Sequence, residues 1–383
     1  MYQSFEFHLP TKIYFGYNKI NELNNIPFKV KRAFIVTDNG VLKSGLIENV
    51  TKILEDNHIS YVIYDDVEPD PSVETVDKAA HRFQQEECDA LIAIGGGSPI
   101  DTAKGVRVIA ENGGSIRDYA GVNLIKQSSN IPLIAIPTTS GTGSEVTMFA
   151  VFSDWEENRK VTVTSPFIAP DISIVDPKMT MTAPTKITAA SGFDAFAHGA
   201  ESFVSRISQP ASDALALSAM RTISKYLRRA VFNGNDVEAR IKMAEASLLA
   251  GMAFNQSFLG LTHAIGSALS GYAHVSHGVA IGLLLPEVIR RNSISLVDKH
   301  VEMASVFRVT DPSLPGWKIT DQLIEDVTKL RNDIGLPQKL QQVGVKEEHL
   351  KGIAHDSVKS GMWKFNPWLA TEEEILDLLK ELF

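Results

Sequence analysis

The sequence predicts an α/β domain with a parallel sheet, followed by an all-helical domain. Short β-branched runs alternate with helical patterns in the first half of the chain, as parallel strands covered by helices do. Beyond about residue 184 the strand-like runs almost disappear and helical periodicity takes over. Pro184 interrupts the pattern within residues 181–185, so we expect domains at 1–182 and 183–383.

Five apolar runs are predicted as buried strands, at residues 33–36, 61–64, 90–94, 133–136 and 172–175. Helices are expected between them at 46–57, at 73–87 and from Asp101 onward. The second domain is expected to contain helices at 189–206, 212–226, 237–254 and 259–269. Thr371 and Glu374 have the spacing of a capping box, which predicts that a last helix begins there.

The composition excludes several classes of protein. The chain has 383 residues with 44% hydrophobic and 22% charged side chains, as ordinary globular proteins do. A formal net charge of −9 argues against nucleic acid or an anionic membrane as the main partner. Cys88 is the single cysteine and cannot form an internal disulfide, which fits a reducing compartment. With no visible signal peptide and no long apolar run, we expect a cytoplasmic protein.

Two glycine-rich loops predict a dinucleotide site. Gly95-Gly96-Gly97-Ser98 follows a predicted strand and opens a helix, so its backbone can approach a phosphate at the helix N-terminus. Taken alone, it could also be a plain glycine-rich turn, although the phosphate-binding interpretation is the better one. The second loop, at residues 137–144 (PTTSGTGS), also follows a strand and adds hydroxyl groups. Two such loops in one open sheet indicate a dinucleotide better than either does alone.

Asp38 ends the first predicted strand in the sequence IVTDNG. Its carboxylate could accept hydrogen bonds from an adenosine ribose and would repel a 2′-phosphate, which favours NAD over NADP. A turn or capping role before Asn39-Gly40 is an equally good interpretation.

Three histidines and one aspartate form a second candidate site. Asp194 and His198 are four residues apart in a helical pattern, so both side chains leave one face of the helix. His263 and His277 follow in another segment rich in small residues. A carboxylate with several imidazoles suits a divalent metal such as Fe²⁺ or Zn²⁺ and suits calcium poorly. Other interpretations stay open: a helix cap for Asp194, a turn for His277, and a surface or core position for each histidine.

In these motifs the chain resembles the iron-containing alcohol dehydrogenases. The resemblance covers nearly the whole chain, through GGGSPIDTAK, PTTSGTGSEVT, SPFIAPDISIVDP, FDAFAHGAE and GLTHAIG followed by HGVA. It implies a Rossmann-like dinucleotide-binding domain and a helical metal-binding domain, the architecture of dehydroquinate synthase-like proteins. It also implies Fe²⁺, with Zn²⁺ as the alternative, bound by Asp194, His198, His263 and His277. These four residues would act in catalysis through the metal.

The resemblance further implies NAD as cofactor and a set of residues that contact it. The set is Asp38, Asp70, Gly96, Gly97, Ser98, Thr138, Thr139, Thr147, Phe149, Lys160 and Met179. Asp70 stands where family members usually carry asparagine, so its contact is the least secure of the set.

Three departures from the family pattern concern the catalytic region. Ser267 stands where many members have a second histidine, so no proton relay can be carried over. His274 is a candidate substitute, although an exposed loop position is the better interpretation. Trp368 replaces the arginine of an NPR motif and, with nearby Met362 and Trp363, suggests an altered substrate pocket. Val151 stands at a position that is polar in some diol-using relatives. Phe254 completes the candidate pocket residues Val151, Phe254 and Met362.

The function implied is reversible hydride transfer between a small primary alcohol and NAD, with the alcohol oxygen activated by a divalent metal. A glycerol or diol dehydrogenase, or another polyol or hydroxy-acid oxidoreductase of this fold, is the nearest alternative. A nucleotide-binding sensor with a structural metal is the non-enzymatic one, although such sites are usually rich in cysteine. The expected partners are a small alcohol or aldehyde and further copies of the chain in a homodimer or larger assembly.

Overall fold

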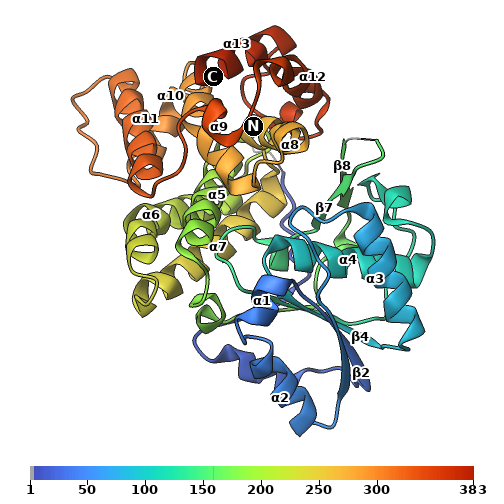
Figure 1. Ribbon diagram of the computed structural model, residues 1–383. Coiled ribbons are helices and arrows are strands. Elements are labelled where there is room, and N and C mark those ends of the chain that lie inside the picture. The colour runs from blue at the N-terminus through green and yellow to red at the C-terminus, as the bar shows by residue number, and fades with distance from the viewer. Residues whose placement is uncertain (1–3, 158) are drawn as a thin grey trace. The chain divides into compact units, whose positions relative to one another are not determined.

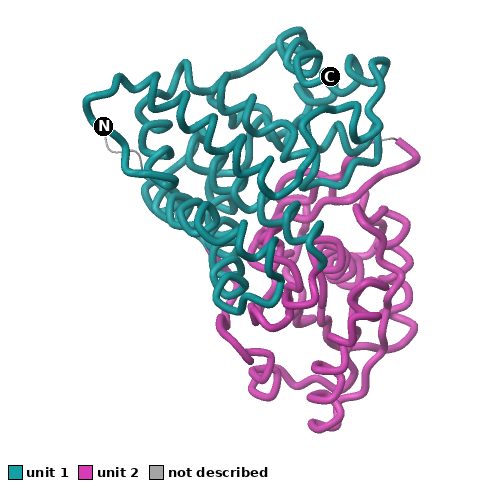
Figure 2. Tube along the Cα trace, turned by 60° about the vertical axis from the view of Figure 1, so that its left-hand side comes forward, with its two compact units in different colours: residues 1–8, 184–383 teal, residues 9–183 magenta. Residues whose placement is uncertain are grey.

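The computed structural model describes residues 4–157 and 159–383 and divides into two compact units (Figure 2). One unit is Leu9–Ala183, and the other combines Pro184–Phe383 with the start of the chain. Residues 4–8 join the helical unit through their backbone. The carbonyl oxygen of His8 accepts from Gln256 Nε2 at 2.8 Å, and that of Glu6 accepts from Gln209 Nε2 at 3.1 Å.

A six-stranded sheet forms the centre of the first unit (Figure 1). Its strands are β1 (Lys12–Phe15), β2 (Arg32–Val36), β3 (Ser60–Tyr64), β4 (Ala90–Gly95), β6 (Leu133–Pro137) and β9 (Ile172–Val175). They lie in the order β1-β9-β6-β4-β2-β3, and every neighbouring pair is parallel. The predicted α/β fold class is therefore confirmed, with all five predicted strands in the sheet. β1 is an edge strand beside β9.

Helices cover both faces of this sheet because successive strand residues point to opposite sides. Phe34 and Leu91 pack into one apolar cluster with α3 (Val73–Gln85) and α4 (Gly97–Asn112). Their neighbours Ile35 and Ile92 pack into a second cluster on the other face, with α2 (Glu48–Asp56). Burial on both faces explains why the strands are continuous apolar runs. Between β2 and α2 lies the short helix α1 (Asn39–Lys43).

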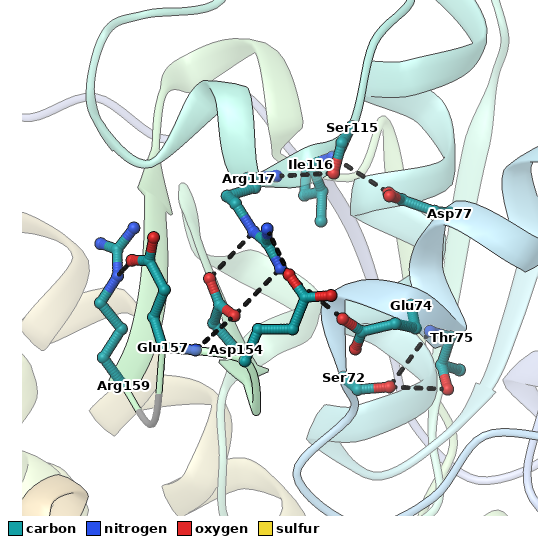
Figure 3. Close-up of polar contacts among 11 residues, drawn as sticks. Ser72, Glu74, Thr75, Asp77, Ser115, Ile116, Arg117, Asp154, Glu157 and Arg159 are labelled. Atoms are coloured by element: carbon teal, nitrogen blue, oxygen red, sulfur yellow. Dashed lines mark hydrogen bonds and ion pairs between the residues drawn. The ribbon is translucent and has the colours of Figure 1, made fainter.

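A second, three-stranded sheet was not expected from the sequence. It consists of β5 (Gly121–Val122), β7 (Phe149–Asp154) and β8 (Arg159–Thr164), with β7 and β8 antiparallel. Arg117 fixes the end of β7 (Figure 3): its Nε lies 2.9 Å from Asp154 Oδ2, and its Nη1 lies 2.9 Å from Glu156 Oε2. The same guanidinium lies 3.6 Å from Glu74 on α3. One arginine therefore links the small sheet to a helix of the large one.

The second unit is helical. Its helices are α5 (Thr185–Val204), α6 (Pro210–Phe232), α7 (Val237–Ser257), α8 (Leu261–Ala273), α9 (His277–Asn292), α10 (Val297–Ala304), α11 (Gly316–Asp333), α12 (Leu350–Lys359) and α13 (Glu372–Leu382). The central helix α5 is buried over most of its length, because α6, α7 and α9 pack around it. The predicted capping box is present, since Glu374 N donates to Thr371 Oγ1 and Thr371 N donates to Glu374 Oε2. Within the described residues, none of the helices is long and apolar enough to cross a membrane.

Two helical glycines give a matched test of the packing in this fold. A Cβ atom at Gly105 of α4 would lie 2.5 Å from Val76 Cγ1 and 3.2 Å from Phe152 Cζ, whereas one at Gly271 of α8 would meet nothing within 4 Å. We expect Gly105→Ala to lower the free energy of unfolding by about 1–3 kcal/mol through overpacking. Gly271→Ala should raise it by roughly 0.5–1 kcal/mol, because alanine loses less backbone entropy.

Thermal unfolding followed by circular dichroism measures both changes against wild type. Equal melting temperatures for the two variants would contradict the close packing of α3, α4 and β7 around Gly105.

Candidate functional site

Asp194, His198, His263 and His277 come together in the helical unit, with their candidate ligand atoms all within 4.8 Å of one another. Asp194 and His198 leave the same face of α5, His263 lies in α8, and His277 is the first residue of α9. Asp194 Oδ1 is the common point, at 3.4 Å from His263 Nε2, 3.6 Å from His277 Nε2 and 3.8 Å from His198 Nε2. The structure thus groups all four candidate ligands from three helices.

The carboxylate of Glu201 contacts Nδ1 of His263, the ring nitrogen that does not face Asp194. This residue was not identified from the sequence. Its Oε2 lies 2.6 Å from His263 Nδ1 and accepts from Gly260 N, while its Oε1 accepts from Thr262 N at 2.6 Å. A carboxylate at Nδ1 fixes the tautomer, so that Nδ1 carries the proton and Nε2 faces the group. The spacing gave a signal: Glu201 lies three residues after His198 and therefore on the same side of α5.

This arrangement fits a bound cation. In its neutral form, with the proton on Nδ1, His263 presents the Nε2 lone pair toward Asp194 Oδ1, itself an acceptor. Both atoms are buried and, among the described residues, neither has a hydrogen-bond partner of good geometry. Two buried acceptors 3.4 Å apart repel each other unless positive charge lies between them. One carboxylate and three imidazoles are the donor set that Fe²⁺ and Zn²⁺ prefer, so the residues fit such an ion.

The pKa values point the same way. Burial alone would raise the pKa of Asp194, but the three imidazoles outweigh it and hold that pKa well below its usual range. Burial alone would lower the pKa of His263, but the Glu201 and Asp194 carboxylates raise it to about 9. The pocket therefore attracts positive charge, and a metal ion would compete there with a proton.

Local packing explains how three helices converge on one point. Gly278 follows His277, and a Cβ atom at Gly278 would lie 2.5 Å from the backbone oxygen of Ala190 in α5. Only glycine lets the start of α9 approach α5 so closely. The ring of Phe254, a predicted pocket residue, lies 4.5 Å from the His198 ring. His277 is the most open of the four, with 37% of its side chain exposed.

The structure also decides between several of the open interpretations. Asp194 lies well inside α5, so it is not a helix cap. His277 begins a helix rather than forming a turn. His274 is exposed and ends α8 in the left-handed conformation, with φ at 51°, outside the group of four. The exposed position preferred for His274 is thus what the structure shows.

The two glycine-rich loops lie side by side in the first unit. β4 and β6 are paired so that Gly95 is opposite Pro137, and both loops leave the sheet at this same edge. Gly96 caps α4, where an added Cβ would lie 3.3 Å from Thr139 Oγ1. Thr138 N donates to the carbonyl of Gly95 at 2.9 Å. Backbone N–H groups at the start of α4 point beyond the strand ends and can bind a phosphate.

The strand order reverses at β2 and β4, next to these loops. The chain passes from β2 to the edge strand β3 and then returns across β2 to β4, β6 and β9. Nucleotides bind outside the carboxyl ends of strands at such a switch point. Asp38, which follows β2, is therefore well placed, but its Oδ1 already accepts from Gly40 N and Val41 N as the cap of α1. The capping interpretation is correct, and the ribose contact stays a prediction.

A buried lysine joins the two loops and was also missed from the sequence. Lys104 of α4 is 0% exposed, and its Nζ donates to Ser144 Oγ, Thr147 Oγ1 and the carbonyl of Phe149. Asp101, one turn earlier, accepts from Ser144 Oγ and from Val151 N. The signal was the spacing of an acid and a base three apart just after the glycine loop.

The remaining predicted residues are distributed over both units. Asp70 and Lys160 form an ion pair at 3.1 Å in the first unit. Met179 is buried at 1% exposure in the core cluster beneath the sheet. Met362 and Trp363 pack against the core around α8, α9, α12 and α13. The cofactor and substrate contacts of these residues stay predictions.

Comparison with known proteins decides the family. Residues 10–177 match the family model described as iron-containing alcohol dehydrogenase, and residues 188–383 match the model of that family's C-terminal region. The chain belongs to the iron-containing alcohol dehydrogenase family. A 1,3-propanediol dehydrogenase of this kind from Klebsiella pneumoniae is 36% identical over 386 residues, with both chains covered completely.

Two further family relatives extend the comparison. An NAD-dependent methanol dehydrogenase from Bacillus methanolicus is 36% identical over 91% of this chain and 92% of its own length. The solved structure of an alcohol dehydrogenase from Oenococcus oeni superposes with a TM-score of 0.96 at 34% identity, covering 99% of this chain and 100% of its own. The protein is thus an oxidoreductase of the iron-containing alcohol dehydrogenase family.

Glu145, which directly follows the second loop and interacts with Lys104, predicts a pH dependence of stability. Burial raises its pKa to about 7, against about 4.3 in an unfolded chain. Between these values the unfolded chain releases a proton that the folded chain retains, so stability falls as pH rises and levels off above about pH 7. Relative to Glu145→Gln, the free energy of unfolding of the wild type should fall by roughly 4 kcal/mol as pH rises from below the lower to above the higher of these two pKa values.

Denaturant unfolding of both proteins at a series of pH values measures the difference. Parallel stability curves would show that Glu145 titrates alike in the folded and unfolded states.

Proposed function

We propose that the protein is an NAD-dependent alcohol dehydrogenase that transfers hydride reversibly between a small primary alcohol and NAD. Its metal would be Fe²⁺, with Zn²⁺ as the alternative, bound by Asp194, His198, His263 and His277. The observation that carries the proposal is the buried pair of atoms, Asp194 Oδ1 and His263 Nε2, which lie 3.4 Å apart without a hydrogen-bond partner of good geometry among the described residues. A family of metal-dependent alcohol oxidoreductases supplies the reaction class.

Residues around the four candidate metal ligands have separate roles in the proposed reaction. When bound, the metal supplies Lewis acidity that lowers the pKa of an alcohol oxygen. Glu201 keeps the His263 proton on Nδ1 and so keeps Nε2 available as a ligand. Phe254 covers one side of His198 and excludes water there, while the partly exposed His277 marks the side that substrate can approach. With Ser267 in place of a histidine, we propose that the alcohol proton leaves through water.

The first unit would bind NAD along the carboxyl ends of β2, β4 and β6. The N-terminus of α4 and the loop after β6 would hold the pyrophosphate, as helix N-termini and glycine loops do. Asp38 would disfavour a 2′-phosphate even while it caps α1, because its charge lies at the strand end. The methanol dehydrogenase relative is named as NAD-dependent, which supports the same choice.

Two relatives point to different alcohols, so a diol is the second candidate substrate. One is named a methanol dehydrogenase and the other a 1,3-propanediol dehydrogenase. Val151 offers no polar atom from its side chain for a second hydroxyl group, which favours a simple alcohol. Values of kcat/KM for methanol, ethanol, 1-propanol, 1,3-propanediol and glycerol decide between the two.

We also propose a homodimer or larger assembly, for which the edge strand β1 offers unpaired backbone groups. Sedimentation analysis tests this.

Asp194→Asn tests the metal site with little change of shape. Loss of the central charge should abolish stoichiometric metal binding and lower NADH-dependent aldehyde reduction by about a thousandfold, since a bound metal contributes several kcal/mol. Metal analysis after anaerobic purification and the NADH assay measure both effects. The control Asp321→Asn, at an exposed position on α11, should leave metal content and rate unchanged. Full metal content and activity in Asp194→Asn would overturn the proposal.

Glu201→Gln tests the orientation of His263. Glutamine keeps the size of the side chain but replaces one acceptor oxygen by an NH₂ group, which opposes a donor in the native structure. We expect metal affinity to fall roughly 10–100-fold, as for other residues that orient a metal-binding histidine. Competition with a chromophoric chelator measures the affinity, and an unchanged value would assign Glu201 a purely structural role.

A further inference from the structure

A small internal cavity is lined in part by Glu201, and His263 is not among its lining residues. Its volume is about 10 Å³, close to the least that one water molecule needs. Side chains of α5, α8, α9 and α10 line it, and six of them are apolar. Its polar lining is Glu201, Thr262, Asn292 and His300.

Two of these polar groups are buried without a partner. Thr262 and His300 are both 0% exposed, and among the described residues neither Thr262 Oγ1 nor His300 Nε2 has a hydrogen-bond partner of good geometry. His300 Nδ1 lies 2.7 Å from the carbonyl oxygen of Leu296, so Nδ1 carries the proton and Nε2 is an acceptor. Burial lowers the pKa of His300, which keeps the ring neutral. Asn292 differs, because its amide exchanges hydrogen bonds with Asn366.

Glu201 completes the set of partners that a water molecule needs. Oε2 is engaged by His263 Nδ1 and Gly260 N, whereas Oε1 accepts from Thr262 N, with the Thr262 side chain also close enough to lower the pKa of the Glu201 carboxyl. A carboxylate oxygen accepts about two hydrogen bonds, so Oε1 has room for one more. A water in the cavity can donate to Oε1 and to His300 Nε2 and accept from Thr262 Oγ1. Three bonds are typical of a buried water.

We propose that this cavity holds one structural water, through which Thr262 and His300 position Glu201 and thereby His263 in the metal site. His300 is then a positioning residue that acts without touching the metal or its ligands. The water binds Oε1 of Glu201 while Oε2 contacts His263 Nδ1. With both oxygens held, the carboxylate keeps its orientation toward His263. This inference rests on the proposed metal site for its functional part, while the water can be observed independently.

The test combines a high-resolution crystal structure with Zn²⁺ binding to Thr262→Val, His300→Phe and their double variant. We expect density for one water between Glu201, Thr262 and His300 in wild type. Each single variant should bind Zn²⁺ roughly tenfold more weakly in competition with a chromophoric chelator. The double variant should bind no more weakly than the weaker single one, because both side chains hold the same water.

Thr320→Val is the matched control, since Thr320 is also buried in a helix but donates to its own helix carbonyl at Gly316. It should not change Zn²⁺ binding. If His300→Phe does not fold, the isosteric Thr262→Val carries the comparison alone. A dry cavity in wild type, additive losses in the double variant, or unchanged affinity in Thr262→Val would each overturn the inference. A wild-type protein that binds no Zn²⁺ would instead overturn the proposed function and the role assigned here to His300, and the density would still decide on the water.

Discussion

The helical unit depends on balancing one buried carboxylate. Asp194 lies inside the central helix α5, almost inaccessible to water, and an isolated ionised carboxylate there would be very costly. Three imidazoles converge on it from α5, α8 and α9, and one of them is oriented by a second buried carboxylate, Glu201. The result is a pocket in which two carboxylates carry negative charge and the imidazole nitrogens face one point. A divalent cation satisfies this arrangement fully, whereas a proton satisfies only one pair of its atoms.

The predicted nucleotide site of the first unit is built in a different way. Its loops contribute backbone N–H groups and glycines rather than converging side chains. Buried charged side chains of α4 hold these loops in place. Lys104 is fully buried and donates to Ser144 Oγ in the second loop and to Thr147 Oγ1 and the Phe149 carbonyl beyond it, while Asp101 accepts from Ser144 Oγ and from Val151 N. Removing one member would leave the other charge buried without compensation. The loops can therefore stay small and open, because α4 and its ion pair hold them in place.

Much of this could be predicted from the sequence, where a strong period or an unusual spacing was present. The five central strands are buried on both faces, so each is an uninterrupted apolar run, and the four ligand candidates stand out as three histidines and an aspartate among small residues. The hairpin of β7 and β8 was missed because its strands mix polar and apolar residues and one face is partly solvated. Glu201 and Lys104 were missed because a charged residue in a helix is usually on the surface.

What distinguishes Glu201 and Lys104 from surface charges is the set of groups opposite them, and those come from distant segments. Glu201 is surrounded by the backbone of Gly260 and Thr262, about sixty residues away, and Lys104 by residues some forty positions further on. No local pattern reports such a partner. The same reasoning applies to Asp38, whose capping bonds and predicted ribose contact call for the same residue type at the same place. Sequence patterns therefore identify the atoms that meet the ligand more readily than the buried charges that hold those atoms in position, and the latter become visible only once the partners of every buried polar group are counted.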